Sequence, residues 1–176
     1  AFIKLLLYGD AFVQVGANPE KDTMSPLKYR AVSNSNVYVD PYATMMRSPT
    51  GSGEVNKCCV IFSYPWAEAI KLFPKLAKTG GAGEIPRNLY SEREIERDYE
   101  QEHELETKTE IAYFYDINNN NYTVFAGSAC TVLEEHSGDD YPVIMDGEAY
   151  IPISQFICMP SAEGFYNHGL GDMLYD

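Results

Sequence analysis

This 176-residue chain has few candidate catalytic or metal-binding residues, and its three histidines are the first to consider. His103 lies in an acidic stretch, His136 in a turn-like segment and His168 in a Gly-rich segment, with no paired cysteines near any of them. A zinc site needs about four Cys, His or carboxylate ligands at workable spacing. The spacing of these histidines therefore does not indicate a zinc site.

A calcium-like pattern occurs in "DINNNNYTVFAG", where Asp116, Asn118 and Asn120 alternate as calcium ligands do. A calcium-binding loop carries Gly at its sixth position and a bidentate Glu at its twelfth. Here those positions hold Asn121 and Gly127. We therefore predict a hairpin turn, because Asn tolerates the left-handed backbone that tight turns require.

Nucleophilic catalysis needs a Ser or Cys that converges with a His and a carboxylate. The chain has no Gly-x-Ser-x-Gly elbow, and "GSAC" (127–130) follows a predicted strand instead of opening a helix. "GGAGE" (80–84) lacks the Lys-Ser/Thr of a phosphate-binding loop, and "GLGD" (169–172) lacks the preceding Gly-rich strand and loop. We predict no catalytic, metal-binding or cofactor-binding residues, no cofactor, and a protein that is not an enzyme.

The four cysteines are Cys58, Cys59, Cys130 and Cys158, and none forms a C-x-x-C pair. Free cysteine commonly behaves as a small hydrophobe. We predict four buried thiols in a reducing compartment. If the adjacent Cys58 and Cys59 lie on a strand, their side chains point to opposite faces.

Composition narrows the class of protein. Apolar residues make up 45% and aromatic residues 13%, and a chain of this length can bury a core as one domain, residues 1–176. The 26 acidic and 13 basic residues give a net charge of −13. Tight nucleic-acid binding needs a basic surface. The nearest candidates, Lys71, Lys75 and Lys78, are spaced like one exposed helix face, so we predict no tight binding of DNA or RNA.

We also predict no signal peptide and no membrane-spanning segment.

Alternating apolar and polar residues, bounded by turn residues, predict mainly short antiparallel strands. A helix is predicted from Tyr64 to Pro74, with Pro65 in its first turn and an apolar face that includes Trp66. The fold class is therefore α+β, with one or two inserted helices. The predicted strands are 10–16, 27–33, 37–43, 54–64, 109–116, 122–127 and 129–135, followed by an extended pair around Asp146-Gly147.

The segment 79–108 is predicted to be a loop followed by an acidic helical insert. Ser91 and Glu94 form a capping box, and Glu, Arg and Gln favour a helix over roughly 91–103. Every even position from Glu92 to Glu106 is acidic, which would instead give a strand one wholly acidic face. Two interpretations of these acidic residues remain, a solvated face without a specific role and a functional acidic surface.

Both ends of the chain interrupt a predicted helix. Residues 1–8 read as the last turns of a buried helix that stops at Gly9, and residues 171–175 read as the start of another. We therefore expect the chain to be a piece of a longer protein, with helices truncated at both ends.

Five segments in order resemble the portal proteins of tailed bacteriophages, of the podovirus-like type. "LLLYGDAFVQV" (5–15) is similar to the helix end and first strand of the portal wing domain. "TEIAYFYDINNNNYTVFAG" is similar to its hairpin. The others are "VYVDPYA" (37–43), "YPWAEAIKLFP" (64–74) and "YIPISQFICMPSAEGFYNHGLGDMLYD" (150–176).

The resemblance implies a wing domain, an α+β domain that lies outside the channel-lining helices. Portal proteins form dodecameric rings at one capsid vertex, where they support genome packaging and ejection and attach the tail. The implied partners are other copies of the chain, capsid proteins, the packaging motor and tail proteins, while DNA passes through the ring without tight binding. The implied location is the virion, and the host cytoplasm during assembly. The alternatives are another virion assembly protein, such as a head–tail adaptor or minor capsid protein, and an antiparallel-sheet hydrolase.

Overall fold

The computed structural model describes residues 9–17, 27–47, 53–79, 108–127, 130–145, 147–159, 164–167 and 169. The helices expected at residues 1–8 and 171–175 and the acidic helix expected over 91–103 lie outside these ranges. Residues 80–107 of the predicted insert, which include His103, also lie outside the described ranges, as does His168.

The described residues form two antiparallel sheets and a two-stranded ribbon. The first sheet, sheet A, has the order β10-β1-β2, with β1 at Asp10–Ala17, β2 at Leu27–Val32 and β10 at Ile153–Ile157. Its central strand aligns Asp10 with Ile157 on one side and Phe12 with Val32 on the other. Among the described residues, the first and last strands are therefore hydrogen-bonded neighbours.

The second sheet, sheet B, has the order β3-β4-β5-β6-β7. Residues of β4 alternate between buried and half-buried along the strand, as its apolar alternation requires. A register shift between Val124 and Phe125 interrupts the pairing of β6 with β7. The strands are β3 (Val37–Val39), β4 (Lys57–Pro65), β5 (Lys108–Asp116), β6 (Asn121–Ala126) and β7 (Thr131–Ser137).

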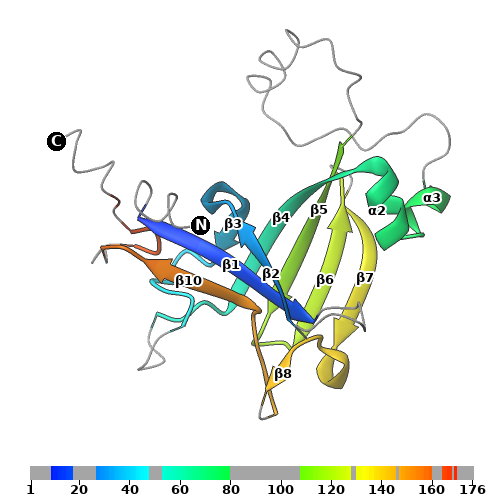
Figure 1. Ribbon diagram of the computed structural model, residues 1–176. Coiled ribbons are helices and arrows are strands. Elements are labelled where there is room, and N and C mark those ends of the chain that lie inside the picture. Colours follow the sequence, from blue (N-terminus) through cyan, green and yellow to red (C-terminus); the bar gives the residue numbers. More distant parts are fainter. Residues whose placement is uncertain are drawn as a thin grey trace, which may run out of the picture.

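The helices are short and lie at one end of sheet B (Figure 1). Pro65 ends β4 and precedes α2 (Trp66–Leu72), which is followed by α3 (Leu76–Thr79). Two single 3-10 turns, η1 (Asn34–Asn36) and η2 (Gly138–Asp140), connect strands. The ribbon pairs β8 (Ile144–Met145) with β9 (Glu148–Ala149). Among the described residues, no helix has the length and apolar composition needed to cross a membrane.

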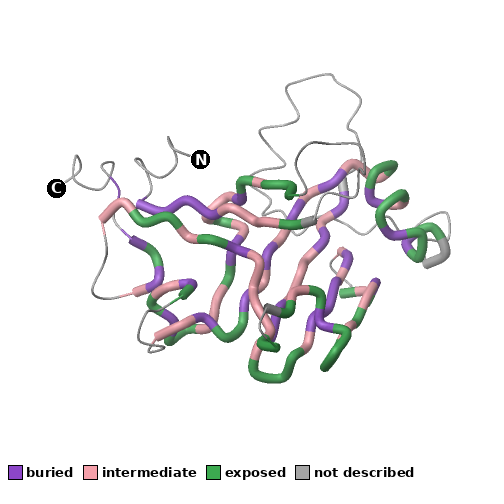
Figure 2. Tube along the Cα trace, turned by 60° about the horizontal axis from the view of Figure 1, so that its bottom comes forward, coloured by how far each residue is buried: buried purple, intermediate pink, exposed green. Residues whose placement is uncertain are grey.

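Sheet A lies across sheet B, in front of it in Figure 1. The inner face of sheet A contributes Phe12, Val32 and Ile153 to the core, and sheet B contributes Val60 and Ile111 among others. Figure 2 shows buried and half-buried segments alternating along the strands. Where a strand has one buried face, as β4 does, burial of apolar surface fixes its register.

The predicted α+β fold class, with few helices, is confirmed. The predicted strands agree with the observed ones within three residues, except that the third ends at Val39 instead of residue 43. The Asp40 carboxylate explains the early end, because it accepts hydrogen bonds from the backbone N–H groups of Asn56 and Lys57 and starts a turn. Pro41 follows directly and has no N–H to donate to a ladder.

Candidate functional site

A buried carboxylate lies where the described chain begins its first strand. Asp10 is the first residue of β1, and its carboxylate is fully buried beside apolar residues of the same strand. An ionised carboxylate is costly to remove from water unless hydrogen bonds replace its hydration. The surroundings of Asp10 must therefore supply donors.

The donors come from the opposite end of the described chain. Gln155 on β10 donates its Nε2 to Oδ1 of Asp10 at 2.9 Å. Asn167 donates its backbone N to Oδ2 at 2.6 Å and its side-chain Nδ2 to Oδ1 at 2.9 Å. Asn34 also donates its Nδ2 to the backbone carbonyl of Asp10, at 3.0 Å. We call Asp10, Gln155 and Asn167 the Asp10 cluster.

The Asp10 cluster joins four segments of the fold. Gln155 and Asn167 also donate to the carbonyl of Phe165, whose ring stacks on Phe12 with centroids 5.8 Å apart. Gln155 further accepts a hydrogen bond from the backbone N of Met46. The carboxylate accepts from the neutral amides of Gln155 and Asn167, so the cluster holds the chain together by directional hydrogen bonds.

A second polar group lies between the two sheets. The guanidinium of Arg30 on β2 lies 3.6 Å from the ring centroid of Phe62 and 4.8 Å from that of Tyr64. It also donates to the Tyr64 hydroxyl, which lies 3.2 Å from the hydroxyl of Tyr113. Burial, followed by the hydrogen bond with Tyr64, raises the pKa of Tyr113. The phenol therefore stays neutral, and the group serves packing by cation–π contact.

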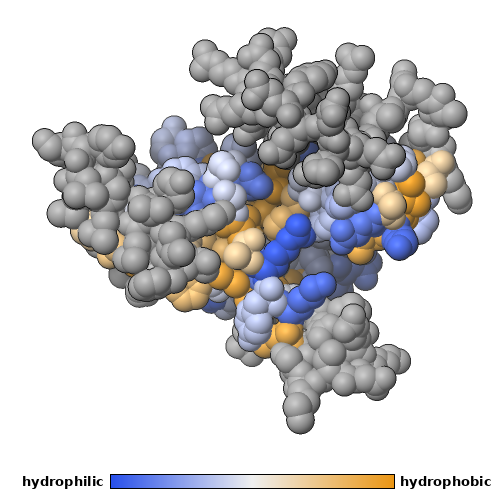
Figure 3. Space-filling view, turned by 45° about the horizontal axis from the view of Figure 1, so that its top comes forward, coloured by the Kyte–Doolittle hydropathy of each residue, from blue (hydrophilic) through white to orange (hydrophobic). Residues whose placement is uncertain are grey.

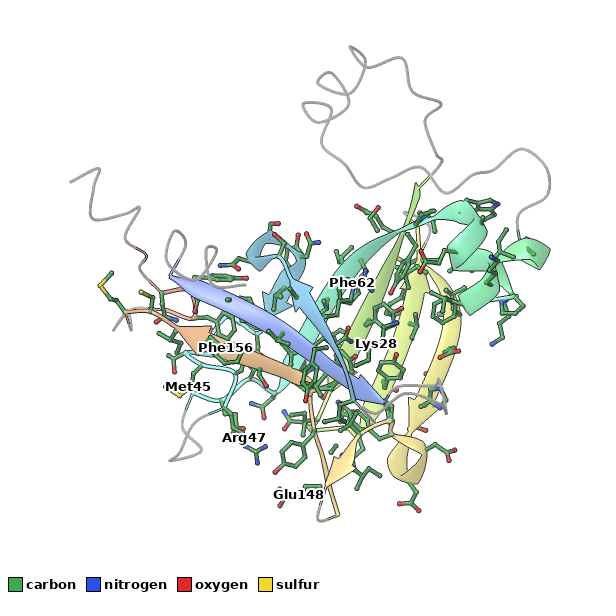
Figure 4. All side chains as sticks on the ribbon, viewed as in Figure 1. Lys28, Met45, Arg47, Phe62, Glu148 and Phe156 are labelled. Carbon is green, nitrogen blue, oxygen red and sulfur yellow. The ribbon has the colours of Figure 1, made fainter. Side chains whose placement is uncertain are left out.

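A groove of about 840 Å³ lies at the end of sheet A where β10 begins, and its lining includes Val15 on β1, Leu27 on β2 and Ile153 on β10. Its walls are largely apolar and include Met46, Val55, Val143, Ile151 and Ile153. Arg47 is its one described cation; the guanidinium lies 4.0 Å from the ring centroid of Tyr150 and 3.9 Å from the carboxylate of Glu54. Figure 4 shows Arg47 and Glu148 on the same side of the molecule, below β10.

The calcium-like segment is a hairpin turn, as predicted. The carboxylate of Asp116 accepts hydrogen bonds from the backbone N and the side chain of Asn119 and lies 3.3 Å from the Lys57 ammonium. Burial opposes ionisation, but these hydrogen bonds and the ammonium outweigh it and hold the pKa of Asp116 below its usual range. Asn120 takes the left-handed conformation, with φ of 46°. Asn118 is exposed.

The remaining candidate residues do not converge within the described part of the chain. His136 on β7 lies 3.8 Å from the Glu134 carboxylate and packs on the ring of Tyr122. Cys58 is buried on β4, whereas Cys130 is exposed in the turn after β6. Across the described ranges, no group of three or more His, Cys, Asp or Glu side chains is placed to hold a metal ion.

The prediction of four buried thiols is wrong for Cys130 and holds fully for Cys58 alone. Cys130 follows Gly127 in a tight turn at the surface, and Cys59 and Cys158 are half-buried. Cys58 and Cys59 do point to opposite faces of β4, and burial raises the pKa of the Cys58 thiol to about 12.

No family model matches the chain, and no curated protein matches it in sequence.

The Asp10 cluster is the part of the site that sequence reasoning missed. In the sequence, the one sign of Asp10 is that it interrupts an apolar run, together with Gly9. A charged residue at the start of an apolar strand is a usable signal, because such a residue is either exposed or satisfied by buried donors. Gln155 and Asn167 carry no local signal of this kind, since both are ordinary polar residues in sequence.

Proposed function

We propose that this chain is the wing domain of a portal-type ring protein, a structural component that supports genome packaging and ejection and head–tail attachment. The proposal assigns no covalent chemistry to the chain. Its partners are copies of itself, capsid and tail proteins and the packaging motor.

The observation that carries the proposal is the junction between the two ends of the described fold. A wing domain is inserted between helical parts of a longer chain, so the polypeptide must arrive and depart at neighbouring points. Gly9 accepts a hydrogen bond from the N–H of Cys158 at 2.8 Å, and Asp10 binds Asn167. These residues belong to the two segments, 5–15 and 150–176, whose sequences resemble the portal junctions.

The charge of the chain supports the same proposal. The exposed residues Glu135, Asp139 and Asp140 lie on β7 and η2, and the whole chain carries a net charge of −13. A conduit for a polyanion should repel its cargo at short range, and like charge does so. A basic, phosphate-binding surface would be expected in a protein that holds DNA.

The test is the assembly state of the complete gene product that contains these residues. Negative-stain electron microscopy and light scattering after size exclusion should find closed rings with a central hole. A gene product that stays monomeric across protein concentration and salt would overturn the proposal.

A further inference from the structure

We propose that the groove at the end of sheet A binds an extended segment of a partner protein, one that places bulky apolar side chains beside a lysine or arginine. This inference goes beyond the proposed ring and does not depend on it. It is carried by the apolar lining of the groove, the backbone hydrogen bonds that hold its walls, and the carboxylates on one of its sides.

The lining of the groove is continuous with the hydrophobic core. Met46, Val55 and Ile153 line it and are buried, and the half-buried Val143 and Ile151 pack against the same core. On the face shown in Figure 3, apolar residues reach the surface among hydrophilic ones, so exposed apolar residues alone do not mark a binding surface. The groove differs because it offers apolar surface in a hollow, where an apolar side chain can leave water.

Backbone hydrogen bonds hold two walls of the groove in place. The N–H of Tyr150 donates to the carbonyl of Val143 at 2.9 Å, which closes the β8–β9 ribbon. On another wall, the N–H of Val55 donates to the carbonyl of Met45 at 3.2 Å. A groove whose walls are already ordered loses less entropy when a ligand enters.

The shape of the groove favours a protein segment over a small molecule. Its lining includes the exposed residues Arg47, Glu148 and Ser154, so the groove opens to solvent. Sites for small molecules usually bury about 70–90% of the surface of the ligand. An open groove covers one side of its occupant, and an extended peptide anchors its side chains on one side in this way.

Charge selects a cationic neighbour for the apolar side chains. Glu148 on β9 is exposed and lines the groove. The exposed Asp140 precedes Pro142, another lining residue, by two positions, which places the two residues within about 7 Å along the backbone. No described cation forms an ion pair with either carboxylate. A lysine or arginine of the partner can pair with them, and the net charge of −13 attracts such a segment.

Arg47, the one described cation of the lining, does not reverse this preference. Its guanidinium lies 3.9 Å from the Glu54 carboxylate, stacks on the ring of Tyr150 and donates to the Tyr150 hydroxyl. The charge of Arg47 is therefore balanced by its own neighbours. In Figure 4, Glu148 lies apart from Arg47, on the β8–β9 ribbon. The partner's cation is thus expected on the ribbon side of the groove.

The first experiment titrates the isotope-labelled 176-residue chain with the peptide acetyl-Ser-Lys-Leu-Phe-Lys-Ser-amide and follows backbone amide signals by NMR. Saturable shifts are expected at Val143, Ala149 and Ile151. Replacing both lysines of the peptide by glutamate, or its Leu and Phe by serine, should weaken binding by about tenfold or more. No saturable shifts with the first peptide at millimolar concentration, shifts confined to residues outside the groove, or equal binding of all three peptides would overturn the proposal.

The second experiment reverses charges in the protein. Glu148→Lys combined with Asp140→Lys should weaken binding of the first peptide by about tenfold or more, because two attractive contacts become repulsive. Glu68→Lys combined with Glu135→Lys is the matched control, since it changes the net charge equally at exposed positions outside the groove lining. The control should weaken binding by no more than about threefold, because salt screens distant charges. An equal loss in both double variants, or no loss in the first, would overturn the proposal.

Discussion

Replacing Asp10 by Asn tests whether the buried carboxylate holds the two ends of the domain together. The substitution keeps the size and shape of the side chain and changes one oxygen into an NH₂ group. In the folded protein this group must face a donor, because the carboxylate oxygens accept three hydrogen bonds from N–H groups of Gln155 and Asn167.

The expected cost follows from those contacts. With the NH₂ group in place of Oδ2, the bond from the backbone N of Asn167 is lost and a buried N–H is left unpaired, which costs about 1–3 kcal/mol. The two bonds to Oδ1 remain but become neutral, at roughly half their strength. Removal of a buried charge offsets part of this loss. We expect Asp10→Asn to lower the free energy of unfolding by about 2–4 kcal/mol.

The assay is equilibrium urea unfolding of the 176-residue chain at neutral pH, followed by circular dichroism and tryptophan fluorescence. A chain of this size should also lose roughly 5–15 °C in Tm. Asp139→Asn is the control, since Asp139 is an exposed acid on η2 and surface substitutions of this kind change stability by about 0.5 kcal/mol or less. The denaturant slope should be equal in all three proteins.

A double-mutant cycle sharpens the test. Asn167 supplies two of the three donors, so Asp10→Asn and Asn167→Ala should be non-additive by about 0.5–3 kcal/mol. If Asp10→Asn is no more destabilising than Asp139→Asn, or if the two changes in the cycle simply add, the carboxylate does not hold the ends together.

Three further predictions concern local features of the fold. The pKa of Asp116 is lower in the folded protein, so the stabilisation by its carboxylate is present above about pH 4 and is lost as the pH falls through the folded pKa. The difference in unfolding free energy between Asp116→Asn and the unaltered protein should therefore shrink in acid. A difference that stays constant with pH would contradict this. At pH 8, iodoacetamide mapping by mass spectrometry should find Cys130 labelled in the native protein and Cys58 labelled only after unfolding, because Cys58 is buried and its pKa is raised to about 12; native labelling of Cys58 would show that β4 opens. Gly53→Ala should lower the free energy of unfolding in urea by about 1–2 kcal/mol, since Gly53 has φ of 71° and an added Cβ would lie 2.4 Å from Oγ1 of Thr44. Combining it with Thr44→Ala should remove the steric contact but not the backbone strain. An unchanged unfolding free energy in Gly53→Ala would show that the backbone is not strained there.

Most of the local structure could be predicted from the sequence. The strongly apolar run 54–64 predicts a strand, and β4 lies there with Cys58, Val60 and Phe62 buried. The Asn run predicts the turn between β5 and β6, where Asn120 takes the left-handed conformation. Strand periodicity and turn chemistry depend on neighbouring residues, so a single sequence carries them.

Burial of single residues was harder to predict. Cys130 was expected to be buried as a small hydrophobe, yet it occupies an exposed turn position with φ of 49°. Arg30 lies within the predicted strand 27–33, and its side chain packs over Phe62 between the sheets. Neither outcome follows from the identity of the residue, because each depends on which segment lies opposite.

The strands, the short helix after Pro65 and the surplus of acidic charge follow from residue type and local spacing, so they can be predicted without the fold. The pairing of β1 with β10, and the contact of Asp10 with Asn167, 157 positions further along the chain, depend on how the distant segments pack. A carboxylate buried by one segment must find its donors on another, and packing of the two sheets selects those donors.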